Sequence, residues 1–498
     1  MTRLTWLALM LSLWPAVAAG QRAPASLTLE EAVALARSNN PEYLSQLNDE
    51  SVADWGVRSA YASFLPGAWV SGGMSYQGGG EPLIGGLTGG DLGVESTPAY
   101  YYSNFSASVG LQLSGADFFR VGRERASRRA VVAGIVSSGH MLEAAVTRQY
   151  LAALRGRDAV ELARKELERA EMNLSLAEAR FAVQSATSIE TTQAEVERGR
   201  AEVELVRAHA LYDTERLRLL QEIGVDLDRD VELTTRMRVF EPVWSLESLV
   251  SLAMSGHPQL SASRANMTVA DAGVDMARSA YFPSLSLTAG VSGFTRRASS
   301  DDYLLTQAQQ RMLQARQDCA FLNDILSRLD PPLPSQPCSE LVVTDGMRNE
   351  ILSQNRQFPF RFETQPLSLS LGISVPVFQG LSRQHQVEAA GAQAEDARYR
   401  LRSEELRVRA EVETAHLNLA AAYRAYVLEQ RNHALAEDQL RLARERYRVG
   451  ATSFLELMEA ETVMARADRA YLMANYAFQE SLAALEAAVG QDLAIPQN

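Results

Sequence analysis

Several residue types are scarce in this sequence of 498 residues, and each scarcity argues against a class of protein. Lys165 is the only lysine, so the sequence has no lysine nucleophile and no phosphate-binding loop with its lysine. The six histidines show no metal-ligand spacing such as His-Glu-x-x-His. Basic residues are outnumbered, and the formal net charge of −13 argues against nucleic acid as a partner. We therefore expect neither an enzyme nor a metal or other cofactor.

Long apolar runs are also scarce. The one clear run, from Leu4 to Val17, follows Arg3 and ends in small residues, which is the pattern of a secretory signal peptide over residues 1–20. No later stretch reaches about 18 apolar residues, so no helical membrane span is expected. The sequence therefore predicts an exported chain whose mature form begins near Gln21.

Cysteine occurs only twice, as Cys319 and Cys338 within one segment. Exported thiols meet an oxidising compartment in which disulfides persist, so we expect these two residues to pair with each other. Closing a loop of this size contributes about 3 kcal/mol by chain-entropy reasoning. Two free thiols are the alternative.

The chain is a tandem duplication. The stretch LEEAVALARSNNPEY, from Leu29, aligns without a gap with LESLVSLAMSGHPQL, from Leu246. The stretch FAVQSATSIETTQAE, from Phe181, is echoed 266 residues later by YRVGATSFLELMEAE, from Tyr447. Each half is expected to open with two short helices joined by a turn before a proline. The predicted repeats are residues 21–245 and 246–498.

Each repeat also contains two stretches in which apolar and small polar residues alternate. In the clearest of them, Leu369, Leu371 and Ile373 alternate with serine and glycine. Alternation over about ten residues is typical of a transmembrane barrel strand, and a half-buried soluble sandwich is the alternative. Four strands cannot close a barrel alone. The strands are expected at about 66–77, 103–114, 283–295 and 365–377.

The rest of the chain has the heptad pattern of a coiled coil. Apolar residues recur every seven positions from Val146 to Phe181, and largely again 266 residues later from Val412 to Tyr447. A helix of about 60 residues runs roughly 90 Å, and few globular domains need such a rod. The predicted antiparallel helical hairpins span about 120–222 and 383–490.

Residues 298–362 form an insertion between the third and fourth strands that is longer than a hairpin loop needs. Apolar periodicity predicts a short helix within it, and the expected disulfide would lie there, on the outer face. Aromatic residues gather at the outer ends of the predicted strands, where an interfacial girdle would lie, with ordinary sheet packing as the alternative. They are Tyr100, Tyr101, Tyr102, Phe105, Phe358, Phe360 and Phe362.

The signal peptide, the duplicated halves, the strands, the long hairpins and the Tyr-x-Val-Gly break together resemble the TolC-like outer membrane efflux proteins. The resemblance runs from about Ser26 to Leu493, excluding the insertion. It implies an α+β membrane protein, in which four strands from each chain of a homotrimer close one twelve-stranded β-barrel. The antiparallel helices would then form a coiled-coil tunnel across the periplasm.

This resemblance also implies a function and partners. The chain would lie among the lipids of the outer membrane and work with a periplasmic adaptor and an inner-membrane pump. It would be a passive conduit for small molecules or polypeptides, in a tripartite efflux or type I secretion system. A soluble periplasmic coiled-coil adaptor or structural protein is the alternative, and it leaves the alternating strands unexplained.

Finally, the resemblance implies a gate at the periplasmic tip, where the helices turn. The acidic ring that faces the lumen in this family falls on Glu456 and Glu459, which lie on one helix face. The hydrogen bond from a tyrosine to an acid, which joins neighbouring hairpins, falls on Tyr447 and Glu190.

Two positions depart from the family pattern at this tip. The arginine that assists closure aligns with Thr452, which predicts a latch of altered strength. The glycine of the first turn is replaced by Gln184, so we expect some backbone strain there. In the second turn, Gly450 keeps the left-handed conformation that ends the helix.

Overall fold

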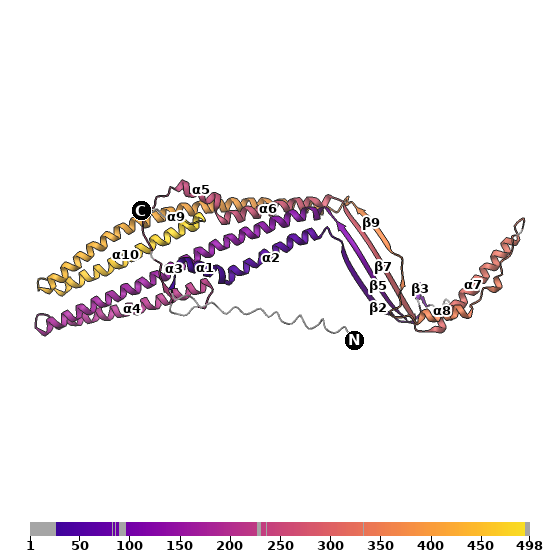
Figure 1. The fold of residues 1–498 in the computed structure, drawn as a ribbon, viewed down its shortest axis with the longest axis horizontal. Helices are drawn as coiled ribbons and strands as arrows, with labels where there is room; N and C mark the ends of the chain where they lie inside the picture. The colour runs from indigo at the N-terminus through magenta and orange to yellow at the C-terminus, as the bar shows by residue number, and fades with distance from the viewer. Residues whose placement is uncertain are drawn as a thin grey trace, which may run out of the picture. The chain divides into compact units, whose positions relative to one another are not determined.

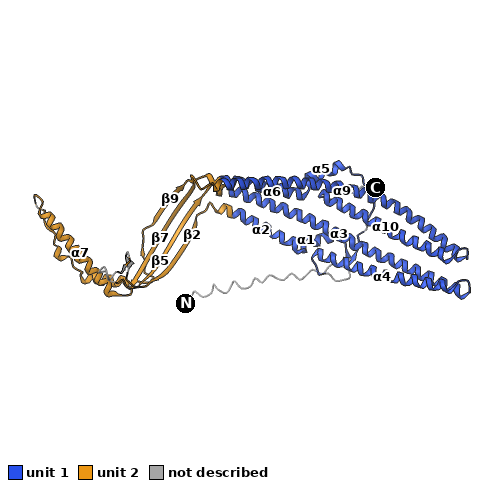
Figure 2. Cartoon of the chain, turned by 180° about the vertical axis from the view of Figure 1, so that it is seen from behind, with its two compact units in different colours: residues 1–58, 119–278, 384–498 blue, residues 59–118, 279–383 orange. Residues whose placement is uncertain are grey.

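The computed structural model describes residues 26–493, apart from 82, 85, 89–95, 227–230, 236 and 332. The predicted signal peptide lies outside the described residues. The chain divides into two compact units (Figure 2). The helical unit comprises residues up to 58, residues 119–278 and residues from 384, and the sheet unit comprises residues 59–118 and 279–383.

Two long antiparallel hairpins, one from each repeat, dominate the helical unit (Figure 1). Helices α3 (Gly115–Ala182) and α4 (Ser188–Ile223) form the first hairpin. Helices α9 (Ser382–Arg448) and α10 (Phe454–Val489) form the second. With 68 residues in α3 and 67 in α9, each of these helices is roughly 100 Å long.

Four shorter helices pack beside the hairpins. They are α1 (Leu29–Asn39), α2 (Pro41–Ala62), α5 (Leu246–Gly256) and α6 (Pro258–Arg278). The side chain of Thr28 caps α1 in a capping box with Glu31, and Ser245 caps α5. Proline begins α2 and α6, where its missing N–H has no helical partner to lose. Helix α1 contacts α4 and α5 contacts α10, so each repeat extends its shorter return helix in the same way.

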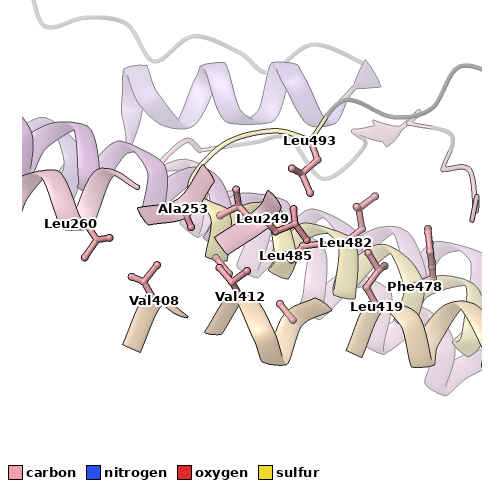
Figure 3. Close-up of a cluster of buried hydrophobic side chains, with 13 residues drawn as sticks. Leu249, Ala253, Leu260, Val408, Val412, Leu419, Phe478, Leu482, Leu485 and Leu493 are labelled. Carbon is pink, nitrogen blue, oxygen red and sulfur yellow. The ribbon is translucent and has the colours of Figure 1, made fainter. Parts of the chain in front are cut away.

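Apolar cores hold each set of helices together. In the second repeat, α5, α6, α9 and α10 share a core that includes Leu249, Val412 and Phe478 (Figure 3). The first repeat has a matching core around Tyr150 and Leu219. Full burial of one such large side chain stabilises the fold by about 1.5 to 3 kcal/mol.

A small parallel pair of strands joins the start of the first repeat to the linker between the repeats. Strand β1 (Ser26–Leu27) pairs with β6 (Glu232–Leu233), and the leucine of each strand is buried. The hydroxyl of Tyr150 donates a hydrogen bond of 2.8 Å to the carbonyl of Leu27. The sequence did not predict this element, because two-residue strands carry no periodic signal.

The sequence predicted no helical segment that could span a membrane, but one long helix meets the criteria for such a segment. Helix α3 contains a window that is long and apolar enough to do so, by length and composition alone. A single helix of this kind is weak evidence for a span, because a core helix of a soluble bundle meets the same criterion.

The sheet unit is built on an antiparallel sheet with the strand order β2, β5, β7, and then β8 and β9 beside β7. Its strands are β2 (Gly67–Gln77), β5 (Tyr100–Leu113), β7 (Ser284–Ala298), β8 (Glu363–Thr364) and β9 (Ser368–Ser374). A short hairpin of β3 (Leu83–Ile84) and β4 (Leu87–Thr88) follows β2.

The fourth predicted strand differs from the expectation of one continuous strand over 365–377. Within these bounds the described strand is β9, which is shorter, and β8 lies just before them. Strand β9 ends before Pro376, which lacks a backbone N–H for a strand ladder. Along the described sheet, β2 and β9 pair on one side only, so both edges of the sheet are open. Each open edge presents backbone groups that another strand can pair with.

The strand register places most apolar residues of β2, β5, β7 and β9 on one face, with Trp69 and Phe294 as exceptions on the other. Cross-strand partners share a face, and the pairs include Val109 with Ala68, and Leu287 with both Leu111 and Leu371. Serine and glycine predominate on the opposite face. Val70 is 81% exposed and Leu371 is 68% exposed, so the apolar face of the single chain is uncovered. An exposed apolar face of this extent marks a membrane or a protein contact.

The insertion is helical, with α7 (Asp301–Ser327) followed by α8 (Asp345–Asn355). A disulfide joins Cys319 of α7 to Cys338, with the two Cα atoms 5.7 Å apart. The buried side chain of Asn355 ties the end of α8 to the end of β7, because its amide group bonds both the N–H and the carbonyl of Ala298, at 2.7 and 3.1 Å. The insertion is therefore anchored to the sheet.

Candidate functional site at the hairpin tips

Both hairpins turn through the same backbone motif, with equivalent residues 266 positions apart. In each turn, two N–H groups after the helix bond back to carbonyls of its last turn, which is the Schellman arrangement. The bonds run from Ser185 to Arg180 (2.8 Å) and from Gln184 to Phe181 (2.9 Å) in the first turn, and from Ala451 to Arg446 (2.8 Å) and from Gly450 to Tyr447 (3.1 Å) in the second. The duplication therefore extends to individual hydrogen bonds.

This motif requires a left-handed residue, which is Gln184 in the first turn and Gly450 in the second. Their φ angles are 61° and 74°. A residue with a Cβ atom pays about 1 to 2 kcal/mol in this conformation, whereas glycine does not. The first turn thus holds the strain that the sequence predicted at Gln184.

Each return helix then starts at a side-chain cap. Thr187 accepts a hydrogen bond from the N–H of Glu190, and the carboxylate oxygen Oε1 of Glu190 accepts from the N–H of Thr187 at 3.3 Å. Ser453 caps α10 by accepting from the N–H of Glu456. The capping box fixes the carboxylate of Glu190 and leaves its second oxygen, Oε2, facing the other hairpin.

That oxygen accepts a hydrogen bond from the hydroxyl of Tyr447, over 3.1 Å. The bond joins α9 of the second hairpin to α4 of the first. Tyr447 is only 1% exposed, and its ring lies 5.7 Å from that of Phe454. Burial and the bond to Glu190 raise the pKa of Tyr447 above its usual value of 10, so the hydroxyl remains a donor at every physiological pH.

Arg180 is a third member of this contact, and the sequence reasoning missed it. Its guanidinium donates to the backbone carbonyl of Tyr447 at 2.9 Å and lies 4.2 Å from the centre of the Tyr447 ring. A second guanidinium nitrogen donates to the carbonyl of Ser185 at 3.2 Å. The missed signal was positional, because Arg180 and Arg446 both precede the repeated aromatic residue. We call Arg180, Glu190 and Tyr447 the tip latch.

The two predicted ring acids have different surroundings. Glu456 accepts hydrogen bonds from Arg446, at 2.8 Å, and from the hydroxyl of Thr452. Thr452 therefore acts within its own hairpin. Within the described residues, Glu459 is exposed and makes no ion pair. Arg446 thus partly offsets the charge of Glu456, while Glu459 has no such partner among the described residues.

Farther from the tip, a row of polar contacts joins α3 to α10. The partners are Asn173 and Glu461 (2.9 Å), Arg169 and Asp468 (2.7 Å), Glu166 and Arg469 (2.8 Å), Asp158 and Tyr476 (2.5 Å), and Arg155 and Glu480 (2.6 Å). His433, which lies in the heptad seam, also contacts Asp468 at 2.9 Å. The two hairpins are therefore held together along their length, and the tip latch adds a contact from α9 to the first hairpin at the tip.

This fold is similar to that of outer membrane channels with long helical hairpins. Residues 344–491 match the family of outer membrane efflux proteins. The fold is similar to that of CusC, whose structures concern transmembrane channel formation, with a TM-score of 0.67 and 17% identity over 93% of this chain and 92% of that one. The resemblance to TolC-like outer membrane efflux proteins, predicted from the sequence, is confirmed, and so is the predicted fold class.

Two further structures show the same fold. The outer membrane protein VceC from Vibrio cholerae has a TM-score of 0.66 and 16% identity, with 93% of this chain and 96% of that one covered. The MtrE outer membrane channel of Neisseria gonorrhoeae, in its open state, has a TM-score of 0.65 and 18% identity, with 93% and 89% covered. A comparison with curated proteins by sequence gives no match.

Proposed function

We propose that this chain is one protomer of a trimeric outer membrane channel of an export system, gated at its periplasmic tip. Four strands from each protomer close a twelve-stranded barrel in the outer membrane, and the hairpins of the three protomers form a periplasmic tunnel. The channel is passive, and it works with a periplasmic adaptor and an inner-membrane pump. Small molecules or polypeptides pass through it, in efflux or in type I secretion.

The sheet carries this proposal. It has two open edges and one uncovered, mostly apolar face that runs in register across β2, β5, β7 and β9. In water such a sheet is an aggregation hazard, whereas closure with copies of itself inside a membrane pairs the edges and surrounds the apolar face with lipid. A soluble periplasmic adaptor, the alternative, leaves both features without a partner.

The helical tips support a gate. The tip latch fastens the first hairpin to the second within one protomer, through a side chain that is fully buried. Acidic side chains stand beside it at the start of α10, where three protomers would bring three copies around one axis. Separation of the hairpins at their tips, with the α3 to α10 contacts kept, would widen such an opening.

We expect the full-length protein, extracted in detergent, to be a trimer by mass and to form pores in planar lipid bilayers. A trimer follows from the number of strands that a barrel of this class needs, because four from each chain are too few to close one. The measurements are light scattering with the detergent contribution subtracted and single-channel conductance. Extraction without detergent, as a monomer with no conductance, would instead favour the soluble adaptor.

We also expect the pores to prefer cations, with Glu459 contributing more than Glu456. Rings of acidic side chains attract cations, but Arg446 already offsets part of the Glu456 charge. Glu459→Gln should therefore reduce the cation preference strongly, and the matched variant Glu456→Gln should reduce it less. Reversal potentials in a potassium chloride gradient measure the difference. Anion preference in the parent, or a larger effect of Glu456→Gln, would contradict this assignment.

A further inference from the structure

The apolar face of the sheet ends in a row of aromatic and arginine side chains. The register pairs Tyr101 of β5 with Tyr76 on one side and with Arg297 on the other, so the three share one face. The rings of Tyr76 and Tyr101 lie 5.1 Å apart. Arg296, one residue earlier in β7, lies on the opposite face because side chains alternate along a strand. This row is at the end of the sheet that carries the insertion (Figure 1).

The segment 356–362, which leads out of the insertion, packs on the same end of the same face. The ring of Phe358 lies 5.9 Å from that of Tyr101, and the ring of Phe362 lies 4.9 Å from that of Phe105. Gly293 makes room for the second pair, because a Cβ atom there would be 2.5 Å from the Phe105 ring. Two aromatic side chains of the segment are therefore anchored on the apolar face.

Those side chains include two more arginines and an uncovered aromatic ring. Arg356 and Arg361 line a surface depression of 410 Å³, together with polar residues of α8. Phe360, between them in sequence, is 78% exposed. We call Tyr101, Arg297, Arg356, Phe358, Phe360 and Arg361 the outer rim.

The charges of the outer rim are not neutralised. In the described part of the sheet unit, Arg297, Arg356 and Arg361 make no ion pair, whereas Arg328 of the same insertion pairs with Asp324 at 2.8 Å. Glu363, two residues after Arg361, pairs in register with Phe294 and so lies on the opposite face. Arg297 thus lies on the apolar face without an ion pair, and Arg356 and Arg361, also without one, line a depression in the segment whose Phe358 and Phe362 pack on that face.

We propose that the outer rim binds the phosphate groups of a lipid in the outer leaflet of the membrane. Aromatic side chains settle where hydrocarbon gives way to headgroups, and arginine binds phosphate through two parallel hydrogen bonds. A headgroup that carries phosphate on sugar offers these acceptors at the level of the rim. The inference rests on the proposed function, because it requires the apolar face to lie in the outer membrane.

The test measures how much lipid the purified trimer retains. Trimers are incubated with lipid A that carries both phosphates or with the same lipid after phosphatase treatment, and bound lipid is counted by native mass spectrometry. We expect retention of the phosphorylated lipid only, weakened about fivefold for each rim arginine removed. Inorganic phosphate at millimolar concentration should not compete fully, because it lacks the acyl chains.

Matched variants distinguish the effect of the outer-rim arginines on lipid retention from the effect of removing arginines elsewhere. Arg297→Gln is compared with Arg296→Gln, its neighbour on the other face, and Arg356→Gln/Arg361→Gln with Arg316→Gln/Arg328→Gln, elsewhere in the insertion. Equal retention in all variants, or equal retention of both lipids, would overturn the proposal. Conductance is recorded on the same samples. If the parent forms pores but the rim variants retain as much lipid as the parent, only the lipid site is refuted. If the parent forms no pores, the proposed function is refuted and the lipid site with it.

Discussion

Replacing Tyr447 with phenylalanine and Glu190 with glutamine together is expected to raise the resting conductance of the channel and the permeability of cells to antibiotics. Phenylalanine keeps the buried ring and its contact with Arg180, and glutamine keeps an oxygen for the capping box with Thr187, so the two changes remove the hydrogen bond and the charge of Glu190. A hydrogen bond to a charged group contributes about 1.5 to 3 kcal/mol, which is roughly a tenfold to hundredfold change in an equilibrium. Three protomers carry one latch each, so the effect on the open fraction is larger than that of one bond.

Arg180→Lys tests the third member of the latch within the same experiment. Lysine keeps the charge, but its single ammonium group cannot bond two carbonyls and cover the Tyr447 ring in the way the planar guanidinium does. We therefore expect increased conductance from this variant as well. The readouts are single-channel recordings and uptake of a large antibiotic by intact cells.

Tyr426→Phe is the matched control for the latch. The hydroxyls of Tyr426 and Tyr471 lie 3.2 Å apart, but they join α9 to α10 inside one hairpin. Loss of this contact should leave the resting conductance unchanged. If the Tyr447 and Glu190 double variant conducts like the parent, the hairpin tips are held closed by some other contact.

The elements that the sequence predicted well are those with a regular period. A heptad pattern that continues over many turns predicts a helix, and alternation with a period of two predicts a strand. The repeated turn at Gly450 and Gln184 was also readable, because the same order of residues occurs twice. The latch pair of Tyr447 and Glu190 came from the family resemblance and from no pattern in the chain itself.

The sequence did not predict which side chains of different helices and strands contact each other. Arg180 reaches α9, and Arg169 reaches α10, over sequence separations of 267 and 299 residues. A long arginine side chain has many rotamers, and only the packed hairpins decide which carbonyl or carboxylate it meets. The register of the sheet could not be predicted either. Alternation along a strand shows which face is apolar, but it does not show which residues of the neighbouring strand lie opposite.

Glu486→Gln is expected to stabilise the protein at about pH 8 and to have little effect at about pH 5. Glu486 lies near the end of α10, between buried residues such as Leu485 and Val489. Burial raises the pKa of Glu486 to about 7, and the nearby carboxyl groups of Asp492 and Glu143 act in the same direction. The folded protein therefore disfavours the ionised carboxylate, which at pH 8 is present in both the folded and the unfolded states.

The sign follows from proton binding in the two states. Between the unfolded pKa, about 4.5, and the folded pKa, about 7, the folded state holds more protons, so the parent loses stability as the pH rises through this range. A shift of this size corresponds to about 3 kcal/mol, of which we expect roughly 2 at a site that keeps some contact with water. Glutamine is uncharged at every pH and still accepts a hydrogen bond from the N–H of Leu493, 3.2 Å from the carboxylate in the parent. The gain should therefore be nearly full at pH 8 and several-fold smaller at pH 5.

Thermal unfolding of the detergent-solubilised protein at the two pH values measures this difference, which we expect to be a rise of roughly 2 to 4 °C at pH 8. Glu480→Gln is the control on the same helix. Glu480 is partly exposed and pairs with Arg155 at 2.6 Å, so its replacement should be neutral or slightly destabilising at both pH values. If Glu486→Gln raises the unfolding temperature equally at pH 5 and pH 8, the gain comes from packing. The charge of the Glu486 carboxylate would then not destabilise the folded protein.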